Sequence, residues 1–235
     1  MLQLRRGADR GRTTADGFAI DCRHSFSFGA YQDPDRPAYR ALCMLNDHRV
    51  TPQSGFPRRR DEDVEILSYV LEGALEYEDS LGTARVLRPG AIHLLCAGTG
   101  VVHSRHNGSH TERVHFLEIG IAPRVHGLRP SAEERVFDRD LARREPVVLA
   151  SPDRDRGGVL VHQDAVLFTS QVAGGEAHRL PVADDRYVDV HLASGRARVT
   201  GQLLDDGDAV TISGEPEILI EGLDAGNDVL IFDLA

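Results

Sequence analysis

The most informative absence from this sequence of 235 residues is lysine, since all 27 basic residues are arginine. A P-loop needs a lysine on the phosphates, and pyridoxal phosphate enzymes need a lysine for the Schiff base. The missing lysine therefore excludes both classes of protein. Aspartate and glutamate number 37, so the formal net charge is −10. We therefore expect neither nucleic acid nor a membrane as a partner, because an acidic surface repels phosphate.

Cysteine is also scarce, with isolated residues at Cys22, Cys43 and Cys96. An odd number without a CxxC spacing argues against a disulfide framework or a cysteine zinc site and is typical of a reducing compartment. The sequence lacks an apolar run of membrane-spanning length, and its first dozen residues lack the apolar segment of a secretory signal. We therefore expect a cytoplasmic protein. The role of the three thiols stays open.

Short β-rich runs alternate with turn residues along the chain, which contains 23 glycines and 11 prolines. These runs predict strands over residues 66–71, 74–78, 91–96, 114–121, 188–192, 197–200 and 229–232. The order of strands and glycines in the second half weakly repeats that of the first. Strands this short, with tight turns between them, indicate an all-β sandwich or barrel, and the repeat favours two barrels in tandem.

One helix is predicted between the two halves. Residues 131–134 (Ser-Ala-Glu-Glu) have the form of a capping box, and apolar residues follow at roughly helical spacing as far as Leu141. We therefore predict an N-terminal barrel over residues 1–125, a linker with a short helix over 126–146, and a C-terminal barrel over 147–235.

Several separate motifs carry a resemblance to a known family. They are residues 24–29 (HSFSFG), 55–57 (GFP), 65–73 (EILSYVLEG), 97–104 (AGTGVVHS), 161–164 (VHQD) and 230–234 (LIFDL). The sequence resembles the cupin superfamily and, much more closely, the pirin family. The resemblance covers nearly the whole chain and implies a bicupin, which consists of two tandem jelly-roll-type β-barrels.

The resemblance also implies a chemistry. Pirins typically hold one metal, usually iron, in the N-terminal barrel through three histidines and one glutamate, and some show quercetin 2,3-dioxygenase activity. Other members are described as redox-linked regulators that contact proteins, including metabolic enzymes in bacteria. Two histidines on alternate residues of a strand face the same way, and ligands from a second strand complete such a site with open positions for dioxygen and substrate.

This chain departs from the ligand pattern of the family. By resemblance, the His-x-His pair falls on Arg59 and Asp61, the third histidine on His103, and the glutamate on Arg105. A guanidinium stays protonated and only donates hydrogen bonds, so arginine is not a metal ligand. A shift in the alignment restores no histidine, because residues 49–92 contain none. We therefore predict that the iron site is lost, with His103 and Asp61 as the remaining candidates for a metal.

These four residues are our candidates for lining a ligand cavity: Arg59, Asp61, His103 and Arg105. If both arginines face the interior, one pairs with Asp61 in place of the metal and the other binds a small anionic ligand. In the alternative, Arg59 swings to the barrel mouth and is solvated, and His103 is a hydrogen-bonded cavity histidine. A metal site improvised by His103 also stays open, with partners from His93, His106 and His115.

Other polar residues are interpreted as structural. Cys96 is expected to be an inert buried thiol, because an apolar strand raises its pKa. Glu65 and Glu76 are interpreted as strand carboxylates. His162 and Asp164 alternate like a ligand pair, but the resemblance places no metal there.

Two functions from different classes follow. The first is a binding or regulatory protein, redox- or stress-linked, which needs no cofactor and has a metabolic enzyme, a regulator or a small anion as its partner. The alternative is a quercetin 2,3-dioxygenase-type oxygenase that holds iron or another divalent metal in a remodelled set of ligands. Whether the chain is an enzyme is open, because an oxygenase of this class needs a metal to activate dioxygen.

Overall fold

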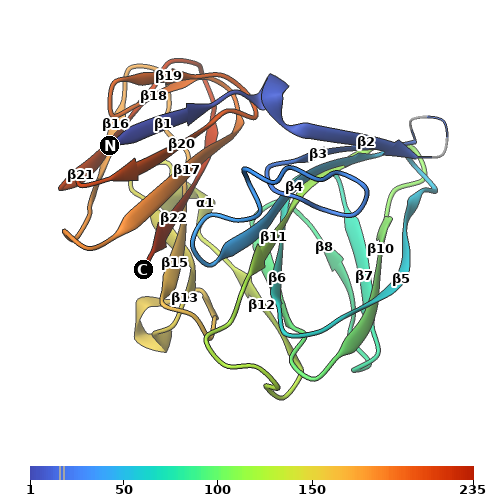
Figure 1. The fold of residues 1–235 in the computed structure, drawn as a ribbon. Coiled ribbons are helices and arrows are strands. Elements are labelled where there is room, and N and C mark those ends of the chain that lie inside the picture. Colours follow the sequence, from blue (N-terminus) through green and yellow to red (C-terminus); the bar gives the residue numbers. More distant parts are fainter. Residues whose placement is uncertain (16, 18) are drawn as a thin grey trace. The chain divides into compact units, whose positions relative to one another are not determined.

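The computed structural model describes residues 1–15, 17 and 19–235, and Figure 1 traces the chain through them. Strands dominate this part of the chain. It divides into two compact units, which we call the N-terminal unit and the C-terminal unit.

The N-terminal unit comprises Gly11–Val136 and Val159–Gln163. Its seven-stranded sheet has the order β12-β9-β6-β11-β4-β3-β2, and its four-stranded sheet has the order β5-β10-β7-β8. The strands of the larger sheet are β2 (Gly11–Ala15), β3 (Ile20–His24), β4 (Leu42–Val50), β6 (Glu65–Glu72), β9 (Ala91–Cys96), β11 (Val114–Ile121) and β12 (Ser131–Val136). Those of the smaller sheet are β5 (Gly55–Asp61), β7 (Leu75–Asp79), β8 (Ala84–Leu87) and β10 (Val101–Asn107).

Alternating burial along these strands places apolar side chains between the two sheets. In β7, Leu75 and Tyr77 are buried, whereas Glu76 and Glu78 are exposed. Phe116 of the larger sheet belongs to the same apolar core as Leu75 and Tyr77. Because successive side chains of a strand point to opposite faces, this alternation defines the inner face of each sheet.

The C-terminal unit comprises Met1–Arg10, Phe137–Gly158 and Asp164–Ala235. One sheet includes strands in the order β1-β20-β17-β22-β15-β13, and a four-stranded sheet has the order β16-β21-β18-β19. The strands are β1 (Leu2–Arg5), β13 (Val147–Ser151), β15 (Ala165–Ser170), β16 (Ala177–Pro181), β17 (Tyr187–Ser194), β18 (Ala197–Val199), β19 (Gln202–Leu204), β20 (Ala209–Ser213), β21 (Glu217–Gly222) and β22 (Asp228–Leu234). Both sheets contribute to its core, as Val190 and Ile220 show.

The all-β prediction and its strands are confirmed, but the sheets are not closed barrels. Among the described strands, the two sheets of the N-terminal unit have separate orders, and no ladder joins their edges. They bury a shared core from two sides instead, which satisfies the apolar faces without a continuous hydrogen-bonded wall. Each unit is therefore a pair of facing sheets.

The helix predicted from the capping box is wrong at its start. Ser131–Val136 is strand β12, whose residues pair with β9 from Ser131 opposite Cys96 to Val136 opposite Ala91. Pairing with a sheet edge outweighs the local helix signal, since tertiary context overrides weak propensities. A single turn, α1 (Arg139–Ala142), follows, and 3-10 turns lie at Gly7–Asp9 and Arg154–Arg156. No helix in the described residues is long and apolar enough to cross a membrane.

The turn after β9 depends on Gly98, which adopts φ +45° and whose added Cβ would lie 2.0 Å from the Leu128 carbonyl oxygen. We expect Gly98→Ala to lower the free energy of unfolding by more than the ~1–2 kcal/mol of left-handed strain, because a backbone atom must also move. Gly82→Ala is the control, since Gly82 has φ +90° and nothing within 4 Å of an added Cβ. Urea denaturation of both variants tests this, and equal losses would contradict it.

Candidate functional site

Strands β5 and β10 bring the four predicted residues together. Their antiparallel register places His103 opposite Arg59 and Val101 opposite Asp61, with a shift between His103 and Arg105. Arg59 and Asp61 share one face of β5 because they are two residues apart. His103 and Arg105 are almost completely buried. Arg59 and Asp61 are partly buried, with 30% and 26% of their side chains exposed.

Hydrogen bonds join these side chains into a ring. Asp61 Oδ2 accepts from Arg59 Nε at 2.9 Å and from His103 Nε2 at 2.6 Å. Arg105 Nη1 lies 3.0 Å from His103 Nδ1 and 2.7 Å from Glu118 Oε1. Arg59 Nη2 closes the ring by donating to the same Glu118 oxygen at 2.6 Å. We call these five residues the arginine–carboxylate network.

Glu118 is the member that sequence analysis missed. It lies on β11 of the larger sheet, faces the interior and is only 2% exposed. Burial alone would raise the pKa of Glu118, but the charges of Arg105 and Arg59 hold this pKa well below its ordinary value. The sequence signal was the single acidic residue in the apolar run 114–121, because burying a carboxylate costs free energy unless hydrogen bonds or a counter-charge offset it.

The tautomer of His103 follows from its neighbours. A guanidinium only donates, so Nδ1 of His103 accepts from Arg105, and Nε2 carries the proton that it donates to Asp61. Burial, together with the nearby arginine charges, lowers the pKa of His103, so the ring is neutral at neutral pH. Two guanidinium charges therefore face two carboxylates.

The Arg59 guanidinium pairs with Glu118 and Asp61, while 30% of its side chain stays exposed. Burial opposes its charge, but Glu118 and Asp61 raise the pKa of Arg59 above its ordinary value. Burial would raise the pKa of Asp61, but the hydrogen bond from His103 and the charge of Arg59 lower it. Burial lowers the pKa of Arg105, which nevertheless stays charged, as arginine does in proteins.

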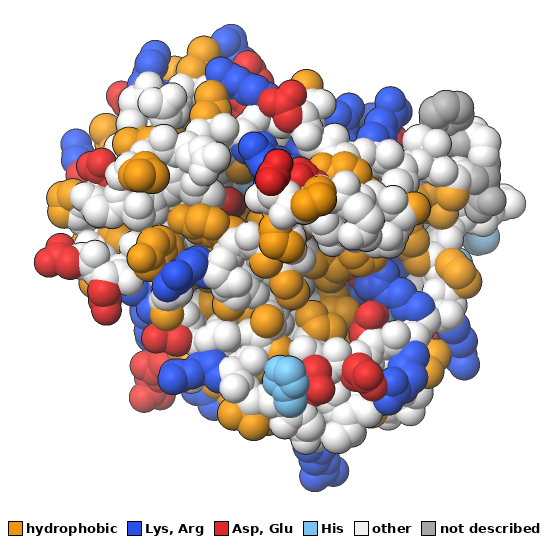
Figure 2. Space-filling model, in the orientation of Figure 1, with side chains coloured by type: hydrophobic (Ala, Val, Ile, Leu, Met, Phe, Trp, Pro, Cys, Tyr) orange, Lys and Arg blue, Asp and Glu red, His pale blue; other side chains and the backbone are white. Residues whose placement is uncertain are grey.

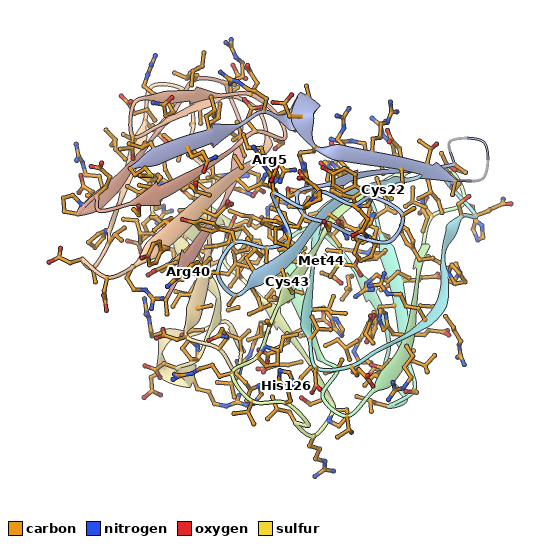
Figure 3. All side chains as sticks on the ribbon, viewed as in Figure 1. Arg5, Cys22, Arg40, Cys43, Met44 and His126 are labelled. Carbon is orange, nitrogen blue, oxygen red and sulfur yellow. The ribbon has the colours of Figure 1, made fainter. Side chains whose placement is uncertain are left out.

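The network extends toward Cys22, which Figure 3 labels together with Cys43. His48 Nε2 lies 3.3 Å from Glu118 Oε2, and His48 Nδ1 lies 2.9 Å from Cys22 Sγ. Burial and the nearby Glu118 charge raise the pKa of Cys22 to about 12, and burial raises the pKa of Cys96 to about 11. Burial also raises the pKa of Cys43. All three are therefore thiols at neutral pH rather than reactive thiolates.

The three other histidines have different surroundings. His115 Nε2 lies 2.9 Å from Asp47 Oδ1, and His106 is exposed. The rings of His93 and Tyr77 lie in a tilted contact with 4.2 Å between their centroids, and burial lowers the pKa of His93 to about 3. Of these three histidines, only His93 contacts the same tyrosine as His103, whose ring lies 6.2 Å from Tyr77.

Some hydrogen-bonding capacity of this interior is unused. Arg105 Nη2 and both ring nitrogens of His93 are buried and have no hydrogen-bond partner among the described residues. The Arg105 guanidinium also lies over the Tyr77 ring, 5.6 Å from its centroid. Such atoms are satisfied by an ordered water or by a small polar ligand.

The donor chemistry of the network decides what it can coordinate. Asp61, His103 and Glu118 carry lone pairs of the kind that metals use. Each of them is hydrogen-bonded to at least one guanidinium. A metal would therefore compete with a guanidinium at Asp61 Oδ2, His103 Nδ1 and Glu118 Oε1.

Comparisons with known proteins identify the family. The model of the Pirin family matches residues 8–121, and the model of the quercetinase C-terminal cupin domain matches residues 148–234. The quercetin 2,3-dioxygenase of Escherichia coli K12 is 35% identical over 234 residues, which cover 100% of this chain and 99% of that protein. The chain belongs to the pirin family.

Solved pirin structures share the fold. The crystal structure of YhhW from Escherichia coli has a TM-score of 0.92 and 35% sequence identity, covering 100% of this chain and 98% of that one. A second structure, the bacterial pirin YhhW in complex with nickel(II), has a TM-score of 0.91 and 34% identity, covering 100% and 99%. The predicted membership of the pirin family and its cupin domains is thus confirmed.

The network gives a prediction about stability. Glu118→Gln should lower the free energy of unfolding by about 3–5 kcal/mol, because Arg59 and Arg105 lose a buried counter-charge. Glu76→Gln on β7 is the matched control, and its exposed side chain should change stability by less than about 0.5 kcal/mol. Denaturant titration measures both variants. A loss at Glu118 as small as the loss at Glu76 would contradict the structural role of the network.

The same carboxylate predicts a pH dependence. Because the folded-state pKa of Glu118 lies well below its ordinary value of 4.5, the unfolded state binds more protons between the two values. This contribution to stability is therefore present above pH 4.5 and is lost on acidification through the folded-state pKa. The pKa of Asp61 is also lowered in the folded state, so its contribution to stability depends on pH in the same direction. Unfolding measured from neutral pH downward should show a shallower acid loss in Glu118→Gln than in the wild type, and parallel curves would contradict the assignment.

Proposed function

We propose that this pirin-family protein has lost the metal site of its N-terminal cupin and that it acts by binding. In this proposal the arginine–carboxylate network replaces the metal. The observation that carries it is the position of the Arg105 guanidinium, which lies 3.0 Å from His103 Nδ1 and 2.7 Å from Glu118 Oε1. A pair of like unit charges about 4 Å apart repels by about 4 kcal/mol at an effective dielectric constant of about 20. The residues present therefore do not fit a divalent ion.

The proposed ligand is a small anion or a neutral molecule with an acceptor oxygen. Both guanidinium charges are already balanced by carboxylates, so an incoming group gains most from the unused hydrogen bonds rather than from net charge. Arg105 Nη2 is a buried hydrogen-bond donor. Neutral His93 adds one donor and one acceptor, and both residues contact the Tyr77 ring. A carboxylate bonded to Arg105 Nη2 satisfies this requirement.

The regulatory part of the proposal concerns a protein partner, either a metabolic enzyme or a regulator, and a redox or stress signal. Its support is membership of the pirin family. On the face drawn in Figure 2, acidic and basic side chains are interspersed, which suits a polar protein interface better than a phosphate backbone.

The alternative function is a quercetin 2,3-dioxygenase-type oxygenase. Two observations favour it: the full-length relative that carries this name, and the nickel complex of the bacterial pirin. It requires a metal at His103 and Asp61, with Glu118 released from its arginines.

Rebuilding the family ligands separates the two functions. In the proposed binding protein, the metal content does not depend on His103, and quercetin is not turned over. The triple variant Arg59→His, Asp61→His, Arg105→Glu should gain about one iron per chain over the wild type, because it restores three histidines and one glutamate. Arg58→His is the control, since it adds a histidine on β5 at a side chain that is 70% exposed. Elemental analysis and quercetin turnover are the measurements.

The possible outcomes are distinct. Iron in the wild type that disappears in His103→Ala, together with quercetin turnover, would establish the oxygenase. A folded triple variant that gains no iron over the wild type would contradict the assignment of the four positions.

A further inference from the structure

A second group of potential ligands lies outside the network, at the edge of the β6–β9 pair. Glu65 and Cys96 are directly opposite each other in this antiparallel ladder, so their side chains share one face. Ser68 bonds to Arg105 on the inner face of β6, and Glu65 is three residues earlier and therefore points to the opposite face. The group is thus separate from the arginine–carboxylate network.

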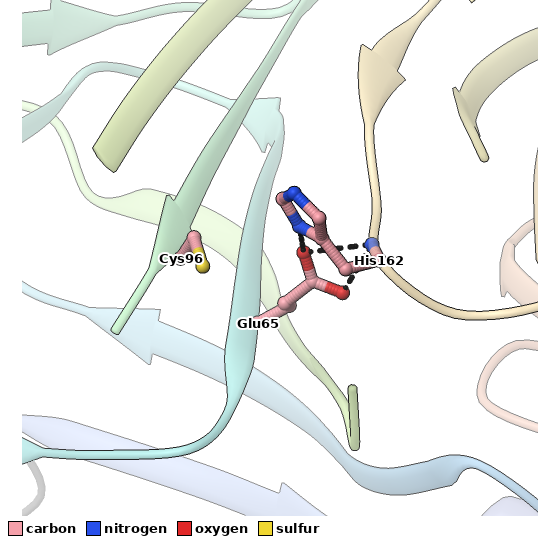
Figure 4. A group of neighbouring side chains, drawn as sticks. All are labelled: Glu65, Cys96 and His162. Carbon is pink, nitrogen blue, oxygen red and sulfur yellow. Dashed lines mark hydrogen bonds and ion pairs between the residues drawn. The ribbon is translucent and has the colours of Figure 1, made fainter. Parts of the chain in front are cut away.

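His162 completes the group within the N-terminal unit, where it follows the short strand β14 (Val159–Leu160). Its Nδ1 lies 2.9 Å from Glu65 Oε1, as Figure 4 shows. One ligand atom of each residue, a carboxylate oxygen, a sulfur and a ring nitrogen, lies within 4.8 Å of the others. We propose that Glu65, Cys96 and His162 bind one zinc ion.

The donor set selects the metal. Sulfur with imidazole nitrogen and one carboxylate suits zinc, whereas calcium and magnesium prefer oxygen ligands alone. Zinc has no preferred geometry of its own and accepts three protein ligands and a water. The side chain of His162 is 39% exposed, so solvent reaches this position and can supply the fourth ligand.

Charge balance supports a cation at this position. Glu65 is fully buried, and among the described residues its ion-pair partner is His162, with no arginine beside it. A zinc ion bound to one carboxylate and one thiolate is neutral overall, which removes the cost of the buried charge. On binding, the Cys96 thiol releases its proton to solvent. The His162 proton moves from Nδ1 to Nε2, and the Nδ1 lone pair binds the metal.

The backbone holds these groups in place before any ion binds. The His162 backbone N–H donates to both carboxylate oxygens of Glu65, at 3.0 and 2.8 Å. The His162 carbonyl oxygen accepts from the Arg124 backbone N–H at 2.9 Å. Glu65 and Cys96 are fixed by the sheet itself, and rigid elements position ligands more precisely than loops do.

Cobalt provides the test, because a cobalt–thiolate bond gives a charge-transfer absorption that oxygen and nitrogen ligands do not. The full-length protein is stripped with a chelator and titrated with Co²⁺, then with Zn²⁺. We expect one equivalent of cobalt with the thiolate band, displaced by zinc. Cys96→Ser should abolish the band and weaken zinc binding by more than about tenfold, since changes outside the ligand set already cost about 10–100-fold. Cys22→Ser is the matched control and should keep both the thiolate band and the zinc affinity of the wild type.

A second variant tests the site at a more exposed residue, in case Cys96→Ser does not fold. His162→Ala changes a side chain that is 39% exposed and should also weaken zinc binding by more than about tenfold. Absence of the band from the wild type, or its survival in Cys96→Ser, would overturn the proposal. His103→Ala should leave zinc binding unchanged. A metal lost from His103→Ala and kept in Cys96→Ser would contradict the proposed function as well as this site.

Discussion

The interior of the N-terminal unit depends on the pairing of Glu118 with two guanidinium groups. A carboxylate that is only 2% exposed loses its hydration, and this cost is offset only by hydrogen bonds or a counter-charge. Arg59 and Arg105 come from β5 and β10 of the smaller sheet, and Glu118 comes from β11 of the larger one. The ion pairs therefore cross the core and fix the two sheets in register with each other. In the proposed function, the two guanidinium charges take the place of the two positive charges of a divalent ion.

Local patterns were sufficient to predict seven of the strands, whereas the family resemblance grouped the candidate residues that lie on β5 and β10. Alternation places Arg59 with Asp61 and His103 with Arg105, whatever the rest of the fold does. Glu118 could not be predicted in this way, because its role depends on which sheet faces β10. The predicted helix is wrong over residues 131–136 for the same reason, because the deciding contact is distant in sequence. The capping box at Ser131 is a local signal, and the edge of β9 that overrides it is distant in sequence.

The group around Glu65 shows a further limit of sequence reasoning. Glu65 and His162 are 97 positions apart, and Cys96 meets them only through the β6–β9 register. Each residue alone has an ordinary structural interpretation, as a strand carboxylate, a buried thiol or a loop histidine. Only their convergence within 4.8 Å suggests coordination chemistry. The lack of a CxxC spacing argues against a cysteine zinc site built from neighbouring residues, but it says nothing about ligands that the sheet brings together from distant positions.

The two faces of the larger sheet in the N-terminal unit differ in how a buried carboxylate is compensated. On the inner face, buried acid is compensated by arginine, and a metal would have to compete with a cation that is already bound. On the opposite face, the ion-pair partner of Glu65 is the His162 imidazole, and a metal would add positive charge there. The proposed loss of a metal ligand set at Arg59 and Arg105 therefore concerns the inner face of the sheet alone. Whether a pirin contains metal and whether its N-terminal cupin can activate oxygen are therefore separate questions, to be answered residue by residue.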